Sequence, residues 1–462
     1  MIFFLLAGIS GIIFSALLIF FRKHFFKVLE ATLALSNAVL SDEEELVKQK
    51  RLLRTLKTML LTLGVSIVII GLICIATVLP IALYIKIKPI PFENLDFGST
   101  GFIMFLSLGS VIPFVLKKRK EDEDYSEASK LLHKLILNNY FLGKFLFSID
   151  RRFKKNKNIK PKSKFLIVSG LARAGTTSLT EQIFKAGKFS SLDYSNMPLL
   201  LAPNLWEKLY KPKKTKLKER KHGDKVLFGL NTIEALEEYF FKVFLNDSFI
   251  SDQYLNRHKI SQEIHDNYLK YQTNIRKNSD SMYLSKNNNL ILRYQSLRKL
   301  NNDFGAIFLF RKPEEHAYSL LNQHLHFSKM QNENNFVLTY MNWLGHHEFG
   351  NNQKVFKLAE AAPKIKFDKA SLNYWLEVWL NYYYYLINIE DQSFMLIEYA
   401  DYLQYPKEVL KAIEKGLNTQ FGFAQIKPFK NPKDIDISNC DADLLLKVNT
   451  VYENLKKRKL KI

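Results

Sequence analysis

Residues 164–182 read KFLIVSGLARAGTTSLTEQ, and this stretch decides the fold of the region around it. Residues 165–168 are wholly apolar, as in a buried parallel strand. Gly170 and Gly175 bound a tight turn, and Thr176 opens a helical pattern. When a strand, a glycine-bounded loop and a helix N-terminus follow one another, backbone N–H groups and the helix dipole point at an anion. The stretch therefore predicts an α/β domain with a phosphate-binding loop.

The loop has the G-x4-G spacing of a Walker A motif but lacks its lysine. Thr176 stands where an ATPase or GTPase needs Lys for the β- and γ-phosphates. The nearby cation is Arg173, two residues before the second glycine. The spacing thus indicates an anion site, and the missing lysine speaks against a nucleoside triphosphatase.

Length and composition narrow the class of protein. A chain of 462 residues suits two or three domains, and 47% apolar residues can form a large core. The net charge of +22 would suit nucleic acid, anionic lipid or anionic small molecules. Many basic residues lie beside apolar spans, as membrane topology requires, and no DNA- or RNA-binding motif occurs. We therefore expect no nucleic-acid partner. The two cysteines, Cys74 and Cys440, cannot form a disulfide framework.

Three uncharged runs near the N-terminus, 2–21, 59–85 and 97–116, are long enough to cross a bilayer as helices. We expect a transmembrane region over 1–120, a helical and basic linker over 121–162, and a catalytic domain over 163–462. The third run contains Gly109 and Pro113, and a re-entrant or interfacial segment is the alternative for it.

Charge predicts the orientation, because basic loops stay on the cytoplasmic side of a membrane. Residues 22–57 carry eight Lys or Arg, whereas 86–99 carry only Lys86 and Lys88. A basic run follows the third apolar run at 117–120. The pattern predicts an integral, multi-pass membrane protein with its N-terminus outside and its catalytic domain in the cytoplasm. If the third run does not span, the catalytic domain falls outside.

After residue 164, strand and helix patterns alternate, which predicts a central parallel sheet covered by helices. Further strands are expected at 282–284, 306–310 and 393–398. The strand at 306–310 ends at Arg311, and the helix after it carries Ser319. One helix is expected over 289–303 and another, with an aromatic stripe that we assign to the core, over 371–388.

Three separated patterns resemble the P-loop sulfotransferases, which use the donor PAPS (3′-phosphoadenosine-5′-phosphosulfate). The first is 170–178, where Arg, a small residue and Gly-Thr-Thr resemble the family's 5′-phosphosulfate loop. The second is Arg311 at a strand end with Ser319 eight residues later, which resembles the family's pair for the 3′-phosphate. The third, 397–406, resembles its Tyr-Glu-Asp-Leu…Pro segment, although Ala400 stands in the Glu position. The resemblance covers 163–430, and it implies a three-layer α/β domain behind a membrane anchor.

The resemblance also implies a set of site residues and no metal. PAPS would be held by Arg173, Ala174, Gly175, Thr176, Thr177, Ser178, Arg311 and Ser319. Arg173 would stabilise the charge that develops during sulfuryl transfer, and Lys286 resembles a lysine that contacts the transferring group in protein-tyrosine sulfotransferases. A base must take the acceptor proton, and Asp193 and His222 are the two candidates.

The predicted activity is transfer of a sulfuryl group from PAPS to a hydroxyl or amine. The membrane region suggests the lipid bilayer as a partner and a lipid or carbohydrate as acceptor. Two alternatives belong to other classes of protein. One is a membrane-bound P-loop kinase or nucleotidase, which would need a Walker lysine and an acidic Mg²⁺ ligand. The other is a non-catalytic membrane scaffold with a degenerate nucleotide fold.

Overall fold

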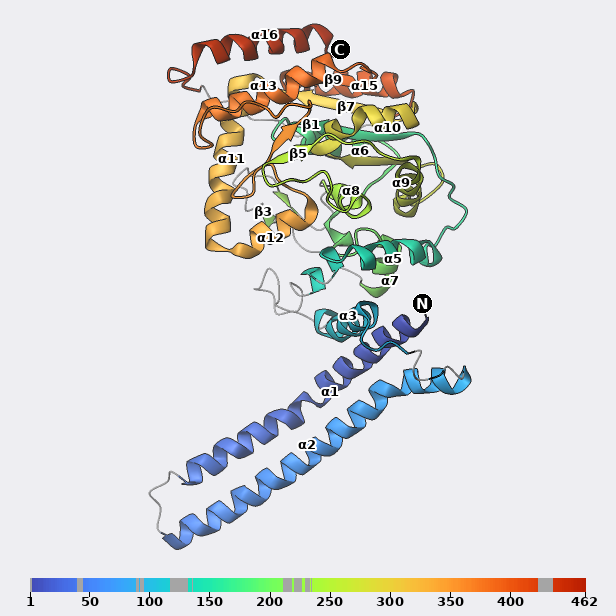
Figure 1. The fold of residues 1–462 in the computed structure, drawn as a ribbon, viewed down its shortest axis with the longest axis vertical. Coiled ribbons are helices and arrows are strands. Elements are labelled where there is room, and N and C mark those ends of the chain that lie inside the picture. The colour runs from blue at the N-terminus through green and yellow to red at the C-terminus, as the bar shows by residue number, and fades with distance from the viewer. Residues whose placement is uncertain are drawn as a thin grey trace. The chain divides into compact units, whose positions relative to one another are not determined.

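The computed structural model describes residues 2–39, 45–88, 91, 95–116, 132–134, 136–210, 218–219, 227–228, 233, 235–422 and 435–462. The chain divides into two compact units, Met1–Asn138 and Asn139–Ile462. Figure 1 shows the helices and strands of both units. The limits at 120 and 162 between the expected membrane region, linker and catalytic domain stay a prediction. Residues 121–131 of the predicted linker lie outside the described residues.

The N-terminal unit consists of the helices α1 (Ile2–Val39), α2 (Glu45–Ile87) and α3 (Thr100–Leu116). Helix α1 packs along both α2 and α3. Two segments, Ile2–Arg22 and Lys48–Ile87, are helical, long and apolar enough to cross a membrane, by length and composition. Only 17% of the most apolar window of α2 is buried, so its large apolar side chains face outward. Helix α3, the third predicted span, has 17 residues, and its apolar part Thr100–Pro113 is shorter than the other two.

Helices α1 and α3 approach one another closely where small residues meet. A Cβ atom on Gly109 would overlap the carbonyl oxygen of Gly8, and one on Gly11 would overlap that of Leu106. Close backbone approach at small residues is the usual way in which helices associate inside a membrane. The glycines of these two predicted spans therefore serve helix packing.

The C-terminal unit is built on a five-stranded sheet in the order β2-β6-β1-β7-β9. All of its strand pairs are parallel. The strands are β1 (Phe165–Gly170), β2 (Phe189–Ser190), β6 (Met282–Lys286), β7 (Gly305–Phe310) and β9 (Met395–Glu398). The prediction of a central parallel sheet is confirmed. Two smaller sheets pair β5 (Tyr254–Asn256) with β8 (Val355–Lys357), and β3 (Lys218–Glu219) with β4 (Leu227–Phe228).

Helices cover both faces of the central sheet. Alternate residues of β1 and β7 point to opposite faces, so each face has its own set of core residues. On one face, Leu166, Val168, Ile307 and Leu309 form a core with α6 (Thr176–Ala186) and α15 (Pro406–Leu417). The other face is aromatic. There Phe165 packs against Tyr268 of α9 (Gln262–Ile275), and Phe308 packs against Tyr294 of α10 (Tyr294–Leu300). The result is a layered α/β unit.

The remaining helices surround this core. They are α5 (Tyr140–Asp150), α7 (Pro203–Leu209), α8 (Glu238–Leu245), α11 (Pro313–Glu333), α12 (Asn335–Leu344), α13 (Leu372–Asn388), α14 (Tyr399–Gln404) and α16 (Ala442–Arg458). The aromatic helix predicted over 371–388 is α13, and its Trp375, Trp379 and Tyr382 are buried as predicted.

The single helix predicted over 289–303 is wrong. A 3₁₀ helix spans Asn288–Leu292, and α10 begins at Tyr294. Arg293 between them has φ −128° and ψ −1°, which is not a helical conformation. The Arg293 guanidinium is buried and donates two hydrogen bonds to the Glu238 carboxylate, at 2.6 and 2.7 Å. A buried charge needs such a partner. The helix is interrupted at Arg293, where the guanidinium reaches Glu238.

Candidate functional site

The loops that follow β1, β6, β7 and β9 gather at one edge of the sheet, because parallel strands end on the same side. The register places Val168 opposite Lys286, Gly170 opposite Leu309, and Phe310 opposite Glu398. The strand order reverses around β1, since β2 and β6 lie on one side of it and β7 and β9 on the other. Ligands of open α/β sheets bind beyond the carboxyl ends of the strands at such a reversal.

The loop 171–175 joins β1 to α6 and holds two residues in the left-handed region. Arg173 has φ +70° and Gly175 has φ +97°. A side chain on Gly175 would overlap the ring of Tyr399, which lies directly against it. The loop is also tied by the bond from the Ala174 N–H to the Leu171 carbonyl, at 3.1 Å. Helix α6 begins at Thr176, so its first N–H groups, which have no carbonyl partner inside the helix, open onto this edge.

The predicted cation and the predicted hydroxyl meet at the loop. The Arg173 Nε–H donates a hydrogen bond to Ser319 Oγ at 3.2 Å, across 146 residues of sequence. Ser319 lies in the second turn of α11, the helix that follows β7. Strand β7 fixes where α11 begins, and Ser319, less than two turns into that helix, lies beside the loop 171–175.

Arg311 lies at the end of β7, on the same edge. Its guanidinium donates to the Glu315 carboxylate at 3.0 Å and lies 5.2 Å from the centre of the Tyr399 ring. The sequence pattern predicted Arg311 and Ser319 as one phosphate pair. In the structure Ser319 accepts a hydrogen bond from Arg173 of the loop, and Arg311 donates to Glu315, one helical turn before Ser319. Their pairing on a phosphate remains a prediction.

The hydroxyls at the start of α6 point to different partners. Thr176 is buried, and its Oγ1 lies 3.5 Å from Asn288 Oδ1. Ser178 Oγ lies 3.1 Å from the Tyr402 hydroxyl. Thr177 is half-buried, and Ala174 is buried in the core under the loop. The predicted donor-binding residues of the loop and helix are thus contiguous in space as well as in sequence.

His316 fixes the loop from α11. Its Nε2 lies 2.7 Å from the Ala172 carbonyl oxygen, so the ring donates a hydrogen bond to the loop backbone. Burial lowers the pKa of His316 to about 3, and the charges of Arg311 and Arg173 act in the same direction. The ring is therefore neutral at physiological pH.

The other predicted catalytic residues are Lys286, Asp193 and His222. Lys286 is buried at the end of β6, beside β1. Asp193 caps a short 3₁₀ helix, Tyr194–Asn196, and its carboxylate accepts from the Ser195 N–H at 2.9 Å. Burial raises the pKa of the Asp193 carboxyl. His222 lies outside the described residues.

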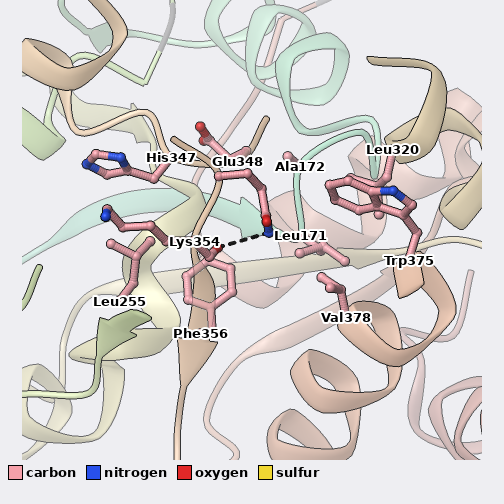
Figure 2. Close-up of a pocket in the computed structure, with 11 residues that line it drawn as sticks. Leu171, Ala172, Leu255, Leu320, His347, Glu348, Lys354, Phe356, Trp375 and Val378 are labelled. Atoms are coloured by element: carbon pink, nitrogen blue, oxygen red, sulfur yellow. Dashed lines mark hydrogen bonds between the residues drawn. The ribbon is translucent and has the colours of Figure 1, made fainter. Parts of the chain in front are cut away.

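A small pocket adjoins the loop on the side of α11 and α13 (Figure 2). Leu171 and Ala172 of the loop line it together with Glu348, Lys354 and Trp375. Glu348 and Lys354 come from the segment between α12 and β8. No local motif distinguishes this segment, because only the fold brings it to the loop.

Among the residues that the structure describes, no group of three or more His, Cys, Asp or Glu side chains could hold a metal ion. The arrangement instead offers two guanidinium groups, a helix N-terminus and several hydroxyls around one loop. This is the chemistry that binds an anion with several phosphate or sulfate oxygens.

Comparisons with known proteins give remote likenesses to solved structures. No family model and no curated protein matches the sequence. The sulfotransferase STF9 from Mycobacterium avium is similar at 13% identity and a TM-score of 0.36, over 76% of this chain and 81% of that one. The sulfotransferase STF1 from Mycobacterium tuberculosis is similar at 12% identity and a TM-score of 0.35, over 82% of this chain and 96% of that one. A sulfotransferase domain from the curacin biosynthetic pathway is similar at 16% identity and a TM-score of 0.28, over 66% of this chain and 93% of that one.

Proposed function

We propose that the protein is a sulfotransferase that moves a sulfuryl group from PAPS to a hydroxyl or amine of an acceptor. The observation that carries the proposal is the contact between Arg173 and Ser319, at 3.2 Å across 146 residues. It joins the two sequence patterns that resemble the donor-binding elements of sulfotransferases. A scaffold with a degenerate site would have no reason to keep both patterns at one loop.

The residues present fit the anionic donor. The N–H groups at the start of α6, with the hydroxyls of Thr177 and Ser178, would hold the 5′-phosphate. Arg311 and Ser319 would hold the 3′-phosphate, and the contacts that they make with Glu315 and Arg173 would be exchanged for phosphate oxygens. Arg173 has a positive φ, a conformation that occurs in loops whose successive backbone N–H groups form an anion-binding concavity.

The reaction is an in-line displacement at sulfur. A bond forms between the acceptor atom and sulfur, while the bond from sulfur to the bridging 5′-phosphate oxygen breaks. Negative charge develops on that oxygen and spreads over the sulfonate. Fixed cations and N–H dipoles would stabilise it, and we assign this task to Arg173, in the loop after β1, and to Lys286, the last residue of β6. No residue of this set requires a metal.

We further propose that the acceptor is a membrane lipid or a carbohydrate, and that the catalytic unit lies in the cytoplasm behind a multi-pass membrane region. Two long apolar helices and the charge difference between 22–57 and 86–99 support this. Sulfolipid profiles of cells with and without the protein test the lipid acceptor, and identical profiles would discard it.

The experiment that tests the function is binding of PAP, the desulfated donor product, to the detergent-solubilised full chain, with AMP and ATP for comparison. We expect PAP to bind more tightly than AMP, since the 3′-phosphate adds a charge-assisted contact of about 1.5–3 kcal/mol, or about 10- to 100-fold. Arg311→Ala should remove this preference, and the exposed Arg152→Ala is the matched control. Equal binding of PAP and AMP, or tighter binding of ATP, would refute the proposal.

A further inference from the structure

Lys459 links the end of α16 to the turn that carries Tyr399. It directly follows Arg458, the last residue of α16. Its ammonium nitrogen lies 2.6 Å from Glu398 Oε2 and 2.6 Å from Asp401 Oδ2. Glu398 is the last residue of β9, and Asp401 lies in the first turn of α14. One side chain therefore holds a carboxylate on either side of Tyr399 in the sequence.

The three charged side chains are largely shielded from water. Their exposed fractions are 28% for Lys459, 7% for Glu398 and 19% for Asp401. Burial acts to lower the pKa of Lys459, but the hydrogen bonds to Asp401 and Glu398 prevail and raise it. A carboxylate that is buried in this way loses much more when its cation is removed than an exposed one does. Water therefore cannot readily take the place of the ammonium group.

The backbone beside Lys459 is itself fixed to the sheet. Helix α16 packs on α13 and contacts β9 (Figure 1). The Leu460 N–H donates a hydrogen bond to the carbonyl oxygen of Leu396 in β9, at 2.7 Å. The Tyr452 hydroxyl of α16 donates to the other oxygen of Glu398. Lys459 thus reaches the two carboxylates from a backbone that is held in place.

Tyr399 borders two parts of the proposed donor site. Its ring lies directly against Gly175, where a Cβ atom would overlap it. The Arg311 guanidinium lies 5.2 Å from the centre of the same ring, within the range of a cation–π interaction. The position of this ring therefore affects both the loop 171–175 and Arg311.

We propose that Lys459 is a positioning residue for the donor site. It holds the two carboxylates that flank Tyr399, and so the turn that carries this ring. The ring then keeps Arg311 and the loop 171–175 in the conformation that accepts the 3′-phosphate of the donor. This inference rests on the proposed sulfotransferase function. A lysine with a purely structural role would stabilise the unit without affecting which nucleotide the unit prefers.

The test measures the binding of PAP and of AMP by calorimetry, with the detergent-solubilised full chain. Lys459→Met keeps the length of the side chain and removes its charge, whereas Lys459→Arg keeps a cation that can bind two carboxylates. Lys457→Met, at an exposed lysine two residues earlier, is the matched control. Asp401→Asn removes only one of the two ion pairs, and it replaces Lys459→Met if thermal unfolding shows that this variant does not fold.

We expect Lys459→Met to lower the preference for PAP over AMP about three- to tenfold, because Arg311 remains but loses its support. Asp401→Asn should lower the preference by a smaller factor, whereas Lys459→Arg and Lys457→Met should keep it. An unchanged preference in Lys459→Met, with or without a lower melting temperature, would overturn the inference and leave the sulfotransferase function intact. An equal loss in Lys457→Met would also overturn it, since net charge alone would then explain the result. Equal binding of PAP and AMP by the wild type would instead refute the function itself.

Discussion

At the scale of single residues, the site depends on backbone conformations that only certain side chains allow. Gly175 has φ +97°, and any Cβ atom there would overlap the Tyr399 ring. The glycine spacing in the sequence predicted a tight turn at this point. It did not predict Tyr399, because that ring arrives from the end of β9, more than two hundred residues later.

Gly175→Ala should destabilise the C-terminal unit and weaken PAP binding. The left-handed backbone and the displaced ring together should cost about 1–3 kcal/mol. Thermal unfolding and PAP calorimetry on the full chain measure both effects. Gly143→Ala is the matched control, because a Cβ at this position in α5 meets neighbours only at 3.4 Å or more. Equal losses in the two variants would contradict the argument.

A second residue-scale prediction concerns acid stability. The Arg293 Nε–H donates to His258 Nε2 at 3.0 Å, and His258 Nδ1 lies 3.0 Å from the Asn256 carbonyl oxygen. Burial, with Arg293 beside it, lowers the pKa of His258 to about 3. Because the folded pKa lies below the unfolded one, the stabilisation is complete above about pH 6.5 and is lost as the pH falls toward 3.

The expected contribution of His258 between pH 7 and pH 5 is a loss of about 2 kcal/mol in the free energy of unfolding. His258→Gln should show a decline that is shallower by this amount, since Gln does not titrate. Unfolding curves of both proteins across this pH range measure the difference. Parallel curves would show that His258 does not carry the effect.

At the scale of elements, α11 assembles one side of the site. Glu315, His316 and Ser319 lie on neighbouring turns and reach Arg311, the Ala172 carbonyl and Arg173 respectively. Residues three and four apart share a helix face, so one helix holds both arginines and the loop backbone. The order of strand, Arg311, Pro313 and Ser319 predicted this helix correctly, since Pro313 fills its first position.

His316→Ala should loosen the loop without unfolding the unit. Losing the hydrogen bond to the Ala172 carbonyl should cost about 1–2 kcal/mol locally, so amide exchange over 171–175 should rise about 5- to 30-fold. Hydrogen exchange read by mass spectrometry measures this. Tyr318→Ala, on the same helix with 41% of its residue surface exposed, should leave exchange in the loop unchanged. Faster exchange in both variants would point to a general effect on α11.

In the N-terminal unit, glycines decide how α1 and α3 pack. Gly109→Leu should push the helices apart, because its Cβ would overlap the Gly8 carbonyl, and we expect a loss of about 1–3 kcal/mol. Gly64→Leu in α2 is the control, since nothing lies within 4 Å of a Cβ at that position. Thermal unfolding in detergent should separate the two variants. Equal stability would show that the close crossing is not required.

The elements also show where the sequence was sufficient and where it was not. Apolar runs predicted β1, β7 and β9, because strands buried on both faces need no alternation. The same reasoning missed the break at Arg293, which a buried partner from α8 causes. It also missed Glu348, because the 3.1 Å bond to Asn288 joins segments that only the folded chain brings together.

At the scale of the whole molecule, the chain combines long apolar helices with a strongly basic overall charge. The most apolar 18-residue stretch within Lys48–Ile87 has a mean hydropathy of 2.8, whereas the whole chain has −0.12 and a net charge of +22. An apolar anchor with basic flanks is held at a membrane by both burial and charge. In the proposed orientation, a donor made in the cytosol reaches the loop 171–175 without crossing the membrane.

The last prediction concerns the orientation of the chain in the membrane. With Cys74→Ser and Cys440→Ser, the chain has no cysteine, and single cysteines report topology. Lys88→Cys, between the second and third apolar runs, should react with a membrane-impermeant maleimide in intact cells. Asp280→Cys, on an exposed loop before β6, should react only after the membrane is permeabilised. Both substitutions lie at exposed side chains, so differences in labelling report the side of the membrane. Labelling of Asp280→Cys in intact cells would place the catalytic unit outside, where α3 does not cross and cytosolic PAPS cannot reach it without a transporter.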